Sequence, residues 1–176
     1  DKLFVDYSGL TIPIVNQETG ETSKAQIFVC VLGASGYTFV HATPTQSTKH
    51  FIESHVQAFH FYGGIPNILV PDNLKAAVIS HKKGVVKLNE SYADMSRHYN
   101  VAIEPARPYK PQDKSKVELG VKAIQRWILM RVRHYTFFSV DELNQQINLL
   151  LDGYNNKTVR RLKKSRTELF ELLDKP

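Results

Sequence analysis

The sequence predicts one α/β domain in which a mixed five-stranded sheet is flanked by helices. Strand-like segments follow one another over the first 43 residues, and helical and strand-like segments then alternate. The composition agrees, because 176 residues with 42% hydrophobic side chains can bury a sizeable core. The same composition excludes disordered, collagen-like and coiled-coil chains.

The amino-terminal part predicts antiparallel strands. Residues 2–7 and 11–15 have strand character, and Gly9 between them indicates a bulge or a kink. The polar, turn-forming stretch that follows predicts a hairpin. Residues 25–34 are almost continuously apolar, as in a central strand buried on both faces, and residues 37–43 are the third strand-like segment.

The middle of the chain alternates between helix and strand patterns. Apolar residues recur at helical spacing over 45–62, and a glycine pair then ends that helix. Residues 67–71 predict a short strand. The basic segment that follows is expected to be a loop, and residues 78–92 have no assigned role. Residues 89–99 and 101–106 predict a short helix and a further strand.

The last third of the chain predicts helices. Three prolines within 105–116 indicate an exposed, partly extended loop, which leads into the longest helix over about 114–134. A second helix is expected at about 140–154. We therefore expect a core at 1–156, followed at 157–176 by a basic linker and a short helix.

Positive charge is concentrated in the middle of the chain. The formal net charge is +6, and residues 71–135 carry 13 basic against 6 acidic side chains. A basic region fits a polyanionic partner, because binding to phosphates releases counterions and supplies affinity independent of sequence. The alternative is a solvated basic face without a partner.

The chain has a single cysteine, Cys30, within an apolar run. This excludes a disulfide framework and indicates a reducing compartment, so that a cytoplasmic location is expected. The apolar runs are much shorter than the roughly 20 residues of a membrane-spanning helix, and no membrane partner is expected. The first residue is Asp1 rather than Met, which indicates a piece of a longer protein.

Three carboxylates stand in unusual places. Asp6 lies within the apolar LFVDYSG, Asp72 follows the apolar ILVP, and Glu118 lies near the expected start of the longest helix. Carboxylates in apolar strands are costly unless they are paired or bind metal. Each also has a structural reading: Asp6 facing solvent, Asp72 capping a helix, and Glu118 interacting with a helix dipole.

Together the three residues fit a magnesium site. Carboxylate oxygens are hard ligands, and Mg²⁺ takes few of them while keeping waters and binding substrate phosphates. Two such ions can clamp an in-line displacement at phosphorus, one activating the attacking hydroxyl and the other stabilising the leaving oxygen. The protein then needs no general base of its own.

The motifs around these carboxylates carry a family resemblance. The segments LFVDYSG, VPDNLKAAV and PARPYKPQDKSKVELGVKAIQRWI resemble the three acidic motifs of DDE recombinases, with most similarity to IstA transposases. The resemblance implies a ribonuclease H-like five-stranded sheet and a catalytic, metal-binding triad of Asp6, Asp72 and Glu118. The 46 positions between Asp72 and Glu118 exceed the spacing in retroviral integrases and fit an IstA-like insertion.

The resemblance also implies activity and partners. It implies metal-dependent cleavage of transposon ends and transfer of 3′-hydroxyls into target DNA, with two Mg²⁺ ions that Mn²⁺ can replace. The implied partners are transposon-end and target DNA, further copies of the chain on that DNA, and an IstB-like AAA+ ATPase in a bacterial, nucleoid-associated complex. The chain has no Walker-type glycine loop, so ATP hydrolysis would belong to that partner.

Accessory DNA contacts are predicted beside the triad. On a helix, side chains four and seven positions from Glu118 share its face. The resemblance to integrases implies lysines four and seven residues after Glu118. The second of these positions is Gln125 in this chain, which departs from the pattern, and the neighbouring Arg126 can take the place of that lysine. Asn73 is predicted to orient a ligand or a phosphate, and a solvated surface is the alternative throughout. The predicted DNA-binding residues are Lys75, Lys110, Lys114, Lys122, Gln125 and Arg126.

Two other functions remain open from the residues alone: a nuclease of the same fold that only hydrolyses, and a catalytically silent DNA-binding or assembly domain. A histidine metal site is excluded, because His50, His55 and His60 are five apart and point around a helix in different directions. The sequence also shows no nucleophile–base motif for acyl transfer.

Overall fold

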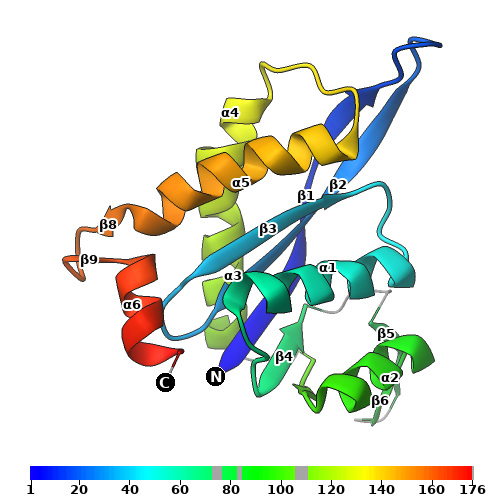
Figure 1. The fold of residues 1–176 in the computed structure, drawn as a ribbon. Helices are drawn as coiled ribbons and strands as arrows, with labels where there is room; N and C mark the ends of the chain where they lie inside the picture. The colour runs from blue at the N-terminus through cyan, green and yellow to red at the C-terminus, as the bar shows by residue number, and fades with distance from the viewer. Residues whose placement is uncertain (73–76, 83–84, 106–110, 176) are drawn as a thin grey trace.

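A five-stranded mixed sheet is the centre of the molecule (Figure 1). The computed structural model describes residues 1–72, 77–82, 85–105 and 111–175. The sheet has the strand order β3-β2-β1-β4-β7, in which β1 to β3 are antiparallel and β4 and β7 run parallel to β1. The predicted fold class is therefore confirmed. The strands are β1 (Lys2–Val15), β2 (Thr22–Leu32), β3 (Thr38–Thr43), β4 (Ile68–Pro71) and β7 (Ala102–Ile103).

The long first strand contains the predicted irregularity. The pairing of β1 with β2 shifts register between Tyr7 and Thr11, where Gly9 has a φ of 72°. A positive φ is readily available to glycine, so this residue lets one strand bulge and continue rather than end. The two predicted segments are thus one strand of 14 residues.

One face of the sheet is covered by aromatic packing from α1 (Thr48–Tyr62) and α2 (Glu90–Tyr99). The ring of Phe51 in α1 lies 5.8 Å from Phe28 of β2 and 6.1 Å from Tyr7 of β1. Helix α1 begins at the Ser47 cap and ends at Gly63, which has a φ of 67°. Because Tyr7 alternates with Asp6 and Ser8 along β1, those two side chains belong to the opposite face.

The opposite face carries α3 (Pro111–Ile124) and α5 (Val140–Asn156). Helix α5 also protects the edge strand β3. The side-chain amide of Asn144 pairs with the backbone of Ala42 at 2.7 and 2.9 Å, and that of Asn155 pairs with Thr38 at 3.1 and 2.8 Å. These contacts satisfy backbone groups that an open sheet edge would expose.

The longest helix begins earlier than predicted. Helix α3 begins at Pro111, inside the segment predicted to be an extended loop, because proline is well suited to the first turn of a helix. Residues 106–110 of that segment lie outside the described residues. The helix continues through the π-helical turn η1 (Gln125–Leu129) into α4 (Met130–Val132). Glu118 consequently lies in the third turn and not near the start.

Two short hairpins were not expected. The basic segment predicted as a loop contains β5 (Val78–Lys82) paired with β6 (Val85–Leu88), since its β-branched residues favour strands despite the interspersed charges. The basic tract after α5 contains β8 (Thr158–Val159) paired with β9 (Lys164–Ser165). None of the helices in the described ranges is long and apolar enough to cross a membrane.

The last helix, α6 (Arg166–Leu173), returns to the core. The ring of Phe170 stacks on Tyr37 with 4.6 Å between centroids, and the Ser35 amide donates to Asp174 Oδ2 at 3.1 Å. Figure 1 shows α6 and the β8–β9 hairpin beside the carboxyl-terminal end of α5. The division of the chain at residue 156 stays a prediction.

Candidate active site

Strand register makes Asp6 and Asp72 neighbours. Val5 of β1 pairs with Pro71 of β4, and the Asp72 amide continues this ladder by donating to the Val5 carbonyl at 3.0 Å. Neighbouring strands lie about 4.8 Å apart, and residues in register share a face. Asp72 is therefore the cross-strand neighbour of Asp6, at the carboxyl end of β4, where α/β sheets commonly place functional groups.

Buried neighbouring residues in β1 and β4 fix the positions of these two carboxylates. Leu3, Val5 and Leu69 have no exposed surface, and the register of the parallel pair is set by that burial. Asp6 itself is half-buried, and its Oδ1 accepts a hydrogen bond from the Tyr7 amide at 2.8 Å. Asp72 is half-buried as well. The prediction that Asp6 lies within a central strand is confirmed.

Helix α3 crosses the same face of the sheet as Asp6. A Cβ atom on Gly120 would lie 2.9 Å from Val31 Cγ2, so only glycine allows α3 to approach β2 this closely. Five residues later, Gln125 Nε2 donates to the Ser8 carbonyl at 2.6 Å. Glu118 lies two residues before Gly120 and shares the helix side of Gln125, and its side chain is exposed.

The three carboxylates are not gathered into one cluster. Among the residues that the structure describes, no three His, Cys, Asp or Glu side chains lie close enough together to hold a metal ion. The chemistry of the donor set still fits magnesium, because Asp6 and Asp72 offer hard oxygen ligands on adjacent strands. The convergence of Glu118 with this pair stays a prediction.

The predicted DNA-binding residues have different outcomes. Lys122 and Arg126 are exposed, one and two turns beyond Glu118. Gln125 is half-buried, and its amide is engaged with β1 as described above. Lys114 lies on α3, but its side chain is outside the described residues. The remaining predicted residues also lie outside them: Asn73, Lys75 and Lys110.

His55 and Cys30 are structural residues of the core and do not form another reactive centre. His55 is fully buried, with Nδ1 2.7 Å from the Phe51 carbonyl and Nε2 3.2 Å from the Tyr92 hydroxyl. Burial lowers the pKa of His55 to about 4. Burial likewise raises the pKa of the Cys30 thiol to about 12. Both residues are therefore neutral parts of the core at physiological pH.

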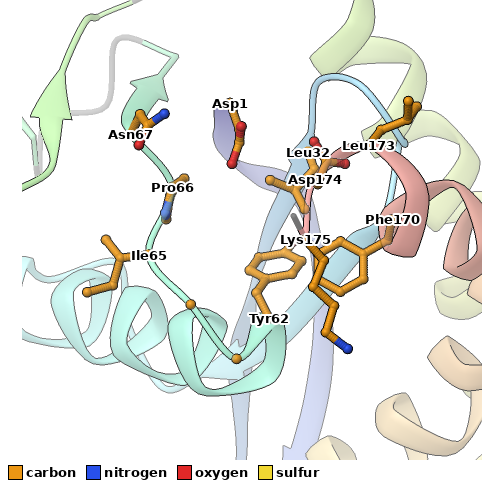
Figure 2. Close-up of a pocket in the computed structure, with 12 residues that line it drawn as sticks. Asp1, Leu32, Tyr62, Ile65, Pro66, Asn67, Phe170, Leu173, Asp174 and Lys175 are labelled. Atoms are coloured by element: carbon orange, nitrogen blue, oxygen red, sulfur yellow. The ribbon is translucent and has the colours of Figure 1, made fainter.

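A hollow of about 390 Å³ lies at the other end of the sheet (Figure 2). It is lined by Asp1 before β1, by Tyr62 at the end of α1 and by Phe170 of α6. Asp6 lies five positions after Asp1, which corresponds to about 17 Å along a strand. This hollow is therefore distinct from the carboxylate site.

Sequence reasoning missed two residues that position the site. Gly120 and Gln125 hold α3 against β2 and β1, respectively. Glycine in the interior of a predicted helix was the available signal, because it lowers helix stability by about 1 kcal/mol and so indicates close packing. Nothing in the sequence indicates the contact between Gln125 and Ser8.

Comparisons with known proteins agree with this architecture. The model of the family described as "Integrase core domain" matches residues 3–111, which contain Asp6 and Asp72. The chain is 45% identical over all of its 176 residues to a putative transposase for insertion sequence IS408 of Burkholderia multivorans, and covers 34% of that protein. It is 32% identical over 87% of its length to the transposase for insertion sequence element IS21 of Pseudomonas aeruginosa, and covers 39% of that protein.

The fold is also that of a solved integrase core. The HTLV-2 integrase catalytic core domain, solved in complex with magnesium, matches with a TM-score of 0.66 at 16% identity, covering 96% of this chain and 94% of that one. The chain spans about a third of the length of the curated relatives it matches. The chain therefore belongs to the integrase core family of DDE polynucleotidyl transferases and corresponds to the catalytic core of IstA-type transposases.

Proposed function

We propose that this chain cleaves transposon ends and transfers their 3′-hydroxyls into target DNA, as the core of a longer transposase. The observation that carries the proposal is the register of β1 and β4, which makes Asp6 and Asp72 cross-strand neighbours. Two half-buried carboxylates side by side repel each other unless a cation lies between them. A structural role for both would be served better by neutral residues.

We infer that Asp6 and Asp72 hold Mg²⁺ and that Glu118 completes the donor set when DNA is bound. The magnesium in the HTLV-2 integrase core supports the choice of metal. We propose two ions, which Mn²⁺ can replace, and their contribution is Lewis-acid activation of the phosphodiester and of the attacking hydroxyl. Asp6 is oriented for this role by the hydrogen bond from the Tyr7 amide.

The rest of the chain positions DNA. The contacts of Gly120 and Gln125 keep α3 over β2 and β1, the strand that carries Asp6, and we propose that Glu118 moves toward the pair when DNA binds. The exposed Lys122 and Arg126 follow Glu118 at one-turn intervals and can bind phosphates along the DNA strand that leads away from the scissile bond. Lys75, Lys110, Lys114 and Asn73 are proposed for the same surface.

The test is a strand-transfer assay with transposon-end DNA, supercoiled target and Mg²⁺, using the full-length transposase that contains this chain. Joined products that disappear in Asp72→Asn, and persist in Asp94→Asn, support the proposal. Asp94 is a suitable control because it is an exposed carboxylate of α2, paired with Arg97. Hydrolysis without joining would indicate a nuclease, and neither reaction would indicate a silent assembly domain.

The proposed partners follow from the same function. We propose that several copies assemble on transposon-end DNA in the bacterial cytoplasm, associated with the nucleoid, and that an IstB-like AAA+ ATPase delivers target DNA. The likeness to transposases of insertion sequences supports this. Mass measurement of the complex with and without end DNA tests the assembly, and a purified ATPase from the same element tests the partner.

A further inference from the structure

A basic and aromatic surface lies beside the carboxyl-terminal end of α3. It is formed where η1, the end of α5 and the β8–β9 hairpin meet around a hollow of about 350 Å³. We call it the Trp127 cradle. It consists of Arg126, Trp127, Arg131, Tyr154, Lys157 and Arg166.

Its cations are held over aromatic rings. The Arg131 guanidinium lies 3.9 Å from the centre of the Trp127 ring, and the Lys157 ammonium lies 4.3 Å from the same ring. The Arg166 guanidinium lies 4.0 Å from the ring of Tyr154. Arg131 also donates to the Trp127 carbonyl at 2.5 Å. Such contacts restrict long side chains before any ligand arrives, which reduces the entropy that binding would cost.

In the part of the chain that the structure describes, no carboxylate forms an ion pair with a cation of the cradle. No Asp or Glu is among the residues that line the hollow. The ion pairs formed among the described residues involve Lys2, Lys49, Arg97 and Lys175, all outside the cradle. Because both cations lie against the Trp127 ring, they are at most roughly 8 Å apart, where they repel. An anion bound beside both cations would relieve this repulsion.

The cradle is continuous with the surface beyond Glu118. In a regular α-helix, Met130 would follow Lys122 and Arg126 at the next turn. Inside η1 the Met130 amide instead donates to the Gln125 carbonyl, five residues back. This extra residue in the turn makes Arg131 the continuation of the row. The π-helical turn thus extends one basic ridge from Lys122 into the cradle.

The hairpin extends the charge in the other direction. Residues 157–166 include six basic and no acidic side chains. Arg160, Arg161, Lys163 and Lys164 are all exposed. A basic ridge with this many exposed cations is much larger than a small anion needs, and a DNA strand carries a repeating series of phosphates that can contact it.

We propose that the Trp127 cradle binds the phosphodiester backbone of a DNA segment away from the reacting bond. The proposal rests on the proposed function for the identity of the polyanion as DNA. It adds a second, non-catalytic DNA contact, formed by cations of η1, α4 and α6 and by Lys157 at the end of α5. Because the contact is to phosphates, it carries no preference for sequence.

The test compares two double variants that lose the same charge. Arg131→Gln with Lys157→Gln removes two cradle cations, whereas Lys49→Gln with Lys175→Gln removes two cations that already have carboxylate partners. Binding of a labelled DNA duplex by the full-length transposase is measured without divalent metal over a range of salt concentrations. The cradle variant should lower the slope of log affinity against log salt by about 2, and affinity at 0.1 M salt by roughly tenfold or more.

A charge-retaining variant controls for loss of DNA binding that is caused by misfolding and not by loss of charge. Arg131→Lys with Lys157→Arg should keep the salt slope of the wild type. Equal slopes for the cradle and control variants would overturn the proposal. The proposal would also be overturned if the cradle variant bound DNA with unchanged affinity but no longer bound polyglutamate. That result would assign the surface to an acidic protein partner.

The two proposals fail separately in this design. Asp72→Asn should bind DNA with the wild-type slope in the absence of metal, because it is outside the cradle. If wild type joins strands but the cradle variant binds normally, only the cradle proposal is wrong. If the cradle variant loses binding but wild type joins no strands, only the catalytic proposal is wrong.

Discussion

The two faces of the sheet are built for different purposes. Toward α1 and α2, the rings of Phe28, Phe51 and Tyr92 and the imidazole of His55 are fully buried and pack against one another. Toward α3, the same strand β1 presents Asp6 and Ser8 beside buried apolar residues such as Phe4, and Ile124 of the covering helix is fully buried as well. One face is closed by aromatic and apolar contact, and the other combines an apolar core with polar groups.

This difference teaches how one strand can serve stability and function together. Alternation along β1 assigns successive residues to opposite faces. Val5 and Tyr7 are buried on one side, and that burial holds Asp6 in place on the other. Truncating the aromatic side chains of the closed face should therefore lower stability, whereas replacing the carboxylates of the other face should lower activity without lowering stability.

The largest expected effect is on the polar face. Asp72→Asn keeps the shape of the side chain and removes a charge, so cleavage and strand transfer in Mg²⁺ should fall to background. The metal-free free energy of unfolding should be unchanged or higher by about 1 kcal/mol, since repulsion with Asp6 is relieved. Strand-transfer assays and urea unfolding measure the two quantities. A variant that unfolds readily or keeps its activity would contradict the catalytic role.

The closed face should show the opposite behaviour. Phe51→Ala removes a ring that contacts Tyr7, Phe28 and Tyr92, and should lower the free energy of unfolding by about 4 kcal/mol. Activity per folded molecule should remain, because Phe51 lies across the sheet from Asp6. Urea unfolding and activity at low temperature separate these effects. Loss of activity in the folded variant would show that the faces are coupled.

The contact between α3 and β2 should respond to paired substitutions. Gly120→Val places methyl groups against Val31 and should cost about 2 kcal/mol of stability while lowering strand transfer, because α3 moves away from β1. In a Val31→Ala background the same change should cost much less. A double-mutant cycle by thermal unfolding measures the coupling. Additive effects would mean that this contact does not position α3.

The closed face should also be sensitive to acid. Burial lowers the pKa of His55 to about 4, below its ordinary value of 6.5. The unfolded chain then binds more protons between these values, so the contribution of His55 is complete above pH 6.5 and is lost as the pH falls toward 4. The slope should be about 1 kcal/mol per pH unit. Unfolding measurements at pH 7.5 and pH 5 should show this loss of stability in the wild type. The His55→Phe variant should not show it.

The smallest expected effect concerns Lys122. Lys122→Ala should lower the salt slope of DNA binding by about 1, the equivalent of one phosphate contact, and leave metal affinity unchanged. Glu53→Ala, on the exposed surface of α1, is a control that should not lower this slope. If Lys122→Ala kept the wild-type salt slope, Lys122 would be a solvated side chain that makes no phosphate contact.

Local patterns in the sequence were sufficient for most elements. The strands β1 to β4 and the helices α1, α2, α5 and α6 were predicted, because burial and turn chemistry act over neighbouring residues. The start of α3 was predicted too late, since three prolines outweighed the helical pattern at Pro111. The hairpin at β5 and β6 was missed because its alternation is short and interrupted by basic residues.

The sequence by itself determined the fold class, the identity of the candidate carboxylates and the basic character of the chain, because these follow from residue types and local periodicity. Only the tertiary structure decided that Asp72 is the cross-strand neighbour of Asp6, that Gly120 and Gln125 seat α3 on the sheet, and that Trp127 brings distant cations together. Such contacts join residues far apart in the chain. They depend on strand register and helix packing, which no local pattern specifies.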